Sequence, residues 1–107
     1  MTDPEPRSLA LAAHRLLPDP PTAYGVALAL AETFRPGRYV THDGGYDVLD
    51  SALLTADIAV MSTGEGVMLS IIRSLAGAGM VDLSRMDALD RARAALIAEA
   101  FALLARR

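Results

Sequence analysis

A short stretch in the first half of the chain holds the residues best suited to chemistry: His42, Asp43, Tyr46, Asp47 and Asp50. Its carboxylates could bind a hard cation such as Ca²⁺, and a histidine beside an aspartate could act as a general base. The aspartates lack the D-x-D-x-D-G spacing of an EF-hand loop, and no nucleophile motif accompanies the histidine. We therefore interpret the stretch as a solvated glycine turn, with Asp43 or Asp47 at a helix N-terminus where the helix dipole favours negative charge. The sequence predicts no metal ligand and no catalytic residue, and a site formed by these side chains stays open as an alternative.

A second stretch, Met61-Ser62-Thr63-Gly64-Glu65, resembles the signature motif of ABC-type ATPases. The resemblance continues to residue 75, and threonine stands at position 63 where that motif usually has glycine. It implies a nucleotide-binding ATPase. Such an enzyme also needs a phosphate-binding loop, G-x-x-x-x-G-K-[ST], whose lysine reaches the phosphates. The chain contains no lysine, so the sequence does not predict an ATPase.

The same residues are typical of the start of a helix. Ser62 followed by Glu65 forms a capping-box pattern, in which each side chain bonds a backbone amide of the first turn. Apolar residues then cover most sides of the expected helix, over about 63–76: Val67, Met68, Leu69, Ile71, Ile72, Leu75 and Ala76. A helix that is apolar on most sides must be covered by several partners, so we predict the central helix of the fold here. Gly64 and Gly66 lower helix propensity, and the pattern does not explain them.

Length and composition indicate one folded domain. The chain has 107 residues, of which 52% are hydrophobic, and this is enough for a core of its own. It contains no cysteine, which excludes disulfides, thiolate metal sites and a cysteine nucleophile. The formal net charge of −3 counts against non-specific binding of nucleic acid, which needs a basic face.

The N-terminus is acidic and rich in proline, whereas a secretory signal is basic and then apolar. The sequence also has no uninterrupted apolar run of about 18 residues, the length that a membrane-spanning helix needs. We therefore expect a cytoplasmic protein that has no membrane segment, and the residues indicate no cofactor.

Most of the remaining chain has helical periodicity. In chain order we expect a loose tail (1–5), a short helix (6–17), an alanine-rich helix capped by Thr22 (23–34), an extended segment (38–42), a third helix (46–60) and a final helix capped by Asp82 or Ser84 (84–105). The alanine-rich helix is almost uncharged, so it should be buried or pack against another copy of the chain. We predict an all-α fold, in which residues 6–107 form a single-domain bundle of four to five short helices around the central helix.

The last predicted helix carries the candidate partner-contact residues. Leu89, Leu96 and Leu103 recur every seven residues, and Phe101 lies off this leucine line. The repeat is too short to indicate a coiled coil, so the leucines are more typical of a core face than of a dimer seam. We expect Phe101 to be an exposed contact residue.

These features favour a small non-catalytic module for protein interaction or assembly that acts through apolar helix faces. Its partner would be another protein or a second copy of the chain. The alternative is a helix-turn-helix regulator, in which the third and central helices form the motif and arginines contact DNA: Arg73, Arg85, Arg91 and Arg93. An enzyme that uses the stretch around His42 is a third class, and it lacks a nucleophile and base at a recognisable spacing.

Overall fold

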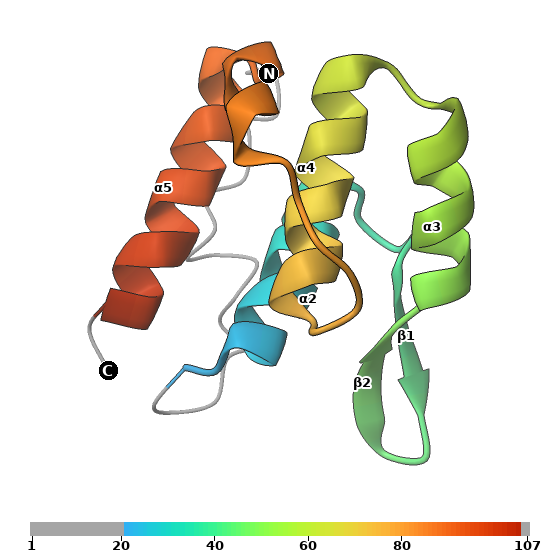
Figure 1. Ribbon diagram of the computed structural model, residues 1–107. Helices are drawn as coiled ribbons and strands as arrows, with labels where there is room; N and C mark the ends of the chain where they lie inside the picture. Colours follow the sequence, from blue (N-terminus) through green and yellow to red (C-terminus); the bar gives the residue numbers. More distant parts are fainter. Residues whose placement is uncertain (1–20, 106–107) are drawn as a thin grey trace, which may run out of the picture.

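The computed structural model describes residues 21–105, so the predicted tail and first helix lie outside the described residues. In chain order the elements are α2 (Ala23–Phe34), β1 (Val40–Asp43), β2 (Tyr46–Leu49), α3 (Ser51–Val60), α4 (Thr63–Leu75), the 3-10 helix η1 (Leu83–Ala88) and α5 (Arg91–Ala105) (Figure 1). This part of the protein is mostly helical. It is not all-α as predicted, because β1 and β2 form a small antiparallel sheet.

Helix α2 has the bounds that the sequence predicted. Thr22 caps it, because its hydroxyl oxygen accepts a hydrogen bond from the amide of Gly25 at 3.1 Å. Every residue from 25 to 31 is buried. The helix packs against α4, α5 and both strands, which explains how a run of alanines with few charges is covered. The prediction of a buried helix is confirmed.

Helix α4 also begins and ends where expected. The Ser62 hydroxyl oxygen lies 3.4 Å from the amide of Glu65, and the hydroxyl donates to Glu65 Oε1 at 2.9 Å. The glutamate therefore holds the serine side chain, a variation on the usual capping box. The helix buries five apolar side chains: Val67, Met68, Leu69, Ile71 and Ile72.

A glycine ends α4 as predicted. Gly77 has a φ of +85°, in the left-handed region that favours glycine. Its amide donates to the carbonyl of Ser74, and the amide of Ala78 donates to the carbonyl of Arg73, each at 3.0 Å. These two bonds form a Schellman motif, which satisfies carbonyls that the helix leaves open.

The predicted third helix is wrong at its N-terminal end. Residues 46–49 form strand β2, and the helix begins only at Ser51. Gly44 and Gly45 both have positive φ, 59° and 87°, which gives a two-residue turn whose twist suits a hairpin. The strands pair from Val40 opposite Leu49 to Asp43 opposite Tyr46. Of the extended segment predicted near 38–42, residues 40–42 lie in strand β1, and the partner strand lies in the same chain.

The predicted final helix over 84–105 is also wrong in its first part. Asp82 caps the short η1, where its side chain accepts from the Ser84 amide at 3.0 Å. The backbone then becomes extended at Leu89. Asp90 caps a new helix, because its Oδ1 accepts from the Arg93 amide at 2.8 Å. Two capping aspartates thus divide one predicted helix into η1 and α5.

Helices α2 and α4 pack together at the centre of the described fold. In Figure 1, α4 lies between α3 and α5, α2 runs behind it, and the hairpin extends away from the helices. Helix α3 packs on α4, and α5 packs on α2. One continuous hydrophobic core results, and Tyr39, just before β1, is its largest fully buried side chain.

Candidate functional site

The polar stretch around His42 does not form one site. His42 Nδ1 and Asp47 Oδ1 lie 3.5 Å apart across the hairpin, and the His42 side chain is 68% exposed. Asp43 lies opposite Tyr46 in the strand register, next to the turn. Asp50 caps α3, because its side chain accepts a hydrogen bond from the Leu53 amide at 3.1 Å. The helix-capping role expected for Asp43 or Asp47 therefore belongs to Asp50. Within residues 21–105 no group of three or more histidine and acidic side chains could hold a metal ion.

The most connected polar cluster lies between α3 and the segment that leads into β1. Asp57 is buried, with 6% of its surface exposed. Arg38 donates to both of its carboxylate oxygens, from Nε to Oδ2 at 2.8 Å and from Nη2 to Oδ1 at 3.0 Å. The phenol of Tyr39 donates to Oδ2 at 2.6 Å. A bidentate arginine and a phenol together satisfy a carboxylate that would otherwise be costly to bury.

These contacts shift the titration of the acid and the phenol in opposite directions. The hydrogen bonds from Arg38, and then from Tyr39, hold the pKa of Asp57 below its ordinary value. Burial, together with the bond to Asp57, raises the pKa of Tyr39. A carboxylate with a lowered pKa and both oxygens engaged is a weak general base. The cluster therefore fits a structural clamp better than a catalytic site.

The sequence analysis missed this cluster, although one signal was present. Asp57 is the only charged residue in α3, and it shares a helix face with Leu53 and Leu54. A lone acid on the apolar face of a helix needs a buried partner. The partner, Arg38, is 19 positions away, and only the hairpin brings it into reach.

A second cluster joins the end of α2 to the starts of α4 and α5. Arg35 forms an ion pair with Glu65, the residue that also holds the Ser62 cap. The guanidiniums of Arg35 and Arg93 lie 5.2 and 5.4 Å from the centre of the Phe34 ring, within the range of cation–π contacts. Both arginines have acidic partners, because Arg93 is paired with Asp90. The cluster ties three helices together and leaves little net charge.

An apolar hollow of about 90 Å³ lies between α4, η1 and α5. Leu83 and Phe101 border it and are 64% and 49% exposed. Buried Ile71 and half-buried Leu75 belong to α4 and contribute to its lining. Phe101 is thus exposed as the sequence predicted, and it stands beside a depression with an apolar wall.

The predicted leucine line does not lie on one helix. Leu89 falls in the connection before α5, whereas Leu96 and Leu103 lie on α5 itself. All three are partly buried and pack against the core. Ile97 and Ala100 are the fully buried residues of that helix. Whether the leucines also touch a partner stays a prediction.

The arginines considered for DNA contact do not gather on one helix face. Arg73 is half-buried, and its side chain lies against Gly79, where an added Cβ would come 3.0 Å from Nε. Arg93 is committed to Asp90 and Phe34. Arg85 and Arg91 lie on η1 and α5. Helix α4, the expected recognition helix, directs its large side chains into the core.

Comparison of the chain with family models, with curated proteins and with solved structures finds no significant match. Among the described residues no helix has both the length and the apolar character needed to cross a membrane.

Proposed function

We propose that this protein is a small non-catalytic module for protein interaction or assembly, and that its contact surface is the apolar hollow beside Phe101. The observation that carries the proposal is the exposure of Leu83 and Phe101 on either side of a depression with an apolar wall. Large apolar side chains around a small pocket are typical of the centre of a protein interface. The hollow has the size of a single aliphatic side chain, which a partner would supply.

The two exposed residues at the hollow support the same proposal, because Leu83 and Phe101 border one depression. Exposed apolar groups that cluster on one face are costly to leave in water, whereas scattered ones are ordinary. In the cluster around Asp57 both carboxylate oxygens are engaged by Arg38 and Tyr39, so this cluster offers an enzyme no evident reactive group. No observation favours the helix-turn-helix regulator.

Self-association tests the proposal most directly. We expect the mass of the wild-type protein from light scattering to rise with concentration, and the variant Phe101→Asp to remain monomeric, because a charge beside the hollow must be desolvated in an interface. Tyr46→Asp is the matched control. It also replaces an exposed aromatic residue by an acid, but on the hairpin, and it should behave as the wild type.

Three results would contradict the assembly version. A strictly monomeric wild type would remove it, and so would a Phe101→Asp variant that associates as well as the wild type. Loss of association in Tyr46→Asp alone would move the contact surface to the hairpin. Circular dichroism of each variant separates loss of contact from loss of fold.

A further inference from the structure

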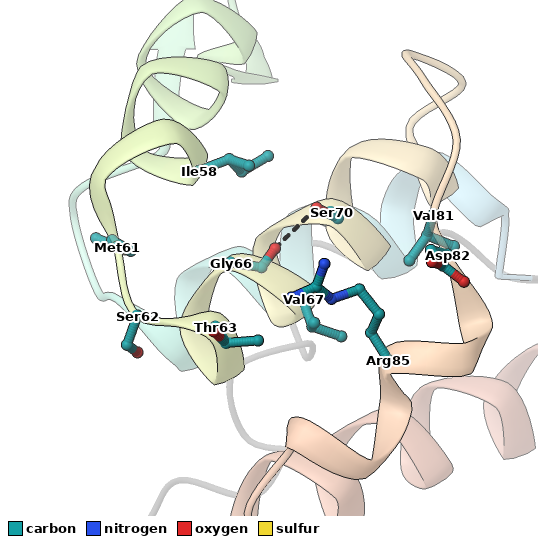
Figure 2. A pocket seen from close by; sticks show the side chains of 10 residues that line it. All are labelled: Ile58, Met61, Ser62, Thr63, Gly66, Val67, Ser70, Val81, Asp82 and Arg85. Atoms are coloured by element: carbon teal, nitrogen blue, oxygen red, sulfur yellow. Dashed lines mark hydrogen bonds between the residues drawn. The ribbon is translucent and has the colours of Figure 1, made fainter.

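A larger cavity, of about 300 Å³, lies nearer the start of α4 than the apolar hollow, and the two share Val81 in their linings. It lies between the end of α3, the first two turns of α4 and the segment that leads into η1 (Figure 2). Ile58, Met61, Val67 and Val81 supply its apolar walls. Its volume is at the lower end of the range of small-molecule pockets in proteins.

A charged group, which also interacts electrostatically with Asp82, points into this cavity. The side chain of Arg85 extends from η1 back across the first turns of α4, and its guanidinium lies beside Val67 and Gly66 in Figure 2. Within the part of the chain that the structure describes, this guanidinium forms no hydrogen bond and no ion pair. Asp82, the acid in the cavity lining, accepts hydrogen bonds from the Ser84 amide and hydroxyl at 3.0 and 2.6 Å.

The hydroxyl groups that line the cavity differ in whether they already donate a hydrogen bond within the protein. Ser70 donates to the carbonyl of Gly66 at 2.8 Å, and Ser62 donates to Glu65. The Thr63 hydroxyl has no hydrogen bond within the described residues. Two unoccupied donors, Arg85 and Thr63, therefore line a space that otherwise has apolar walls.

We propose that this cavity binds a small organic anion, with one carboxylate on an apolar body. The guanidinium of Arg85 offers a planar fork of donors that matches a carboxylate, and Thr63 offers one further donor. The apolar body would cover the half-buried Ile58, Met61 and Val81. This inference goes beyond the proposed interaction function and does not depend on it.

The charges around the cavity favour a carboxylate over a dianionic phosphate. A single guanidinium balances one negative charge. A second charge would lie near Asp82, whose pKa is lowered by its bonds to Ser84 and which therefore stays ionised. A monoanion suits this arrangement, and a phosphate group does not.

The test is a titration of the ¹⁵N-labelled full-length protein with hexanoate, followed in amide NMR spectra. We expect saturable shifts confined to amides around the cavity, such as those of Gly66, Ser70 and Val81. The alcohol 1-hexanol has the apolar body without the charge, and inorganic phosphate has charge without the body. Both should bind at least about tenfold more weakly, because each lacks one of the two matched parts.

Two arginine variants complete the experiment. Arg85→Gln should weaken hexanoate binding about tenfold or more, because it removes the charged donor. Arg91→Gln makes the same change of charge at an exposed residue of α5 that does not line the cavity, and it should bind as the wild type. Phe101→Asp should also keep full binding, which separates this site from the apolar hollow.

The proposal is overturned if hexanoate and 1-hexanol bind equally well, if Arg85→Gln binds as tightly as the wild type, or if the shifts lie away from the cavity. It is also overturned if no saturable binding occurs at all. A preference for inorganic phosphate over hexanoate would replace the carboxylate by another anion and would contradict the ligand class proposed here.

Discussion

Asp57 is the one buried charged residue in the part of the chain that the structure describes. It receives hydrogen bonds from Arg38 and Tyr39, which belong to the segment that leads into the hairpin, while it belongs to α3 itself. Its ionised form is the one that these donors stabilise. The clamp should therefore depend on pH.

The pKa of Asp57 is lower in the folded protein than in the unfolded chain, so the folded state binds fewer protons at acidic pH. Its contribution to the free energy of unfolding is fully present above the ordinary carboxyl pKa of about 4 and is lost as the pH falls through the lowered value. Glu65 titrates in the same direction, because its bonds to Ser62 and Arg35 lower its pKa. We expect urea denaturation to show stability that declines below about pH 4.

Asp57→Asn tests the assignment, because an amide cannot ionise. The variant should be less stable than the wild type at neutral pH and should lose less stability on acidification. Asp43→Asn, at an exposed position of the hairpin, should follow the wild-type curve. Parallel pH curves for Asp57→Asn and the wild type would show that the clamp does not dominate acid unfolding.

At the residue scale the sequence predicted the caps of α2 and α4 correctly, missed those of α3 and α5, and missed the long-range pairs. Thr22 and Ser62 were assigned from local patterns, because a cap and its target amide lie within three residues. The cluster of Arg38, Tyr39 and Asp57 depends on how two elements pack, and no local pattern carries that information. The apolar hollow is of the same kind, since α4, η1 and α5 meet only in the fold.

At the scale of elements, α2 and α4, which have clear start and stop signals, were predicted correctly. The hairpin and the division of the last helix into η1 and α5 were not predicted. The hairpin signal was present as two glycines between short runs that contain β-branched and aromatic residues. It was overridden by the helical spacing that continues from residue 46 to residue 60. In the last segment, Asp82 and Asp90 are both good caps, and periodicity alone does not show that both are used.

The contact between α4 and η1 explains a glycine that the sequence left unexplained. A Cβ at Gly64 would lie 2.8 Å from the carbonyl oxygen of Ala88, closer than real Cβ atoms approach. At Gly66 the nearest such atom is the carbonyl oxygen of Ile58 at 3.7 Å, an ordinary contact. Only the first glycine is therefore required by packing.

These distances predict opposite effects for the same substitution two residues apart. Gly64→Ala should destabilise the protein by about 1–3 kcal/mol, because the end of η1 must move. Gly66→Ala should stabilise it by about 0.5–1 kcal/mol through helix propensity. Chemical denaturation measures both. Equal stabilisation by the two variants would show that η1 does not pack against the first turn of α4.

At the scale of the whole molecule the core has two central helices, not one. The sequence placed α4 at the centre because its branched side chains are strongly apolar. Helix α2 packs against α4, α5, β1 and β2, whereas α4 packs against α2, α3 and η1. Its alanines are individually weak hydrophobic signals, but their small size lets neighbours approach its backbone. Side-chain hydrophobicity therefore identified α4 as central and underestimated the central role of α2.

We expect helix α4 to join the described elements into one cooperative unit. Truncation of one of its buried side chains should therefore destabilise all of these elements together. Ile71 is 3% exposed. Ile71→Ala should lower the free energy of unfolding by about 2–5 kcal/mol, the range for truncation of a buried isoleucine. The unfolding transition should remain single, with the same midpoint by circular dichroism and by tyrosine fluorescence.

Val60→Ala, at a residue that is 81% exposed, should change stability by no more than about 0.5 kcal/mol. A loss below about 1 kcal/mol for Ile71→Ala would place that side chain outside the core, and separate midpoints would mean that the hairpin and α3 unfold apart from α2 and α4.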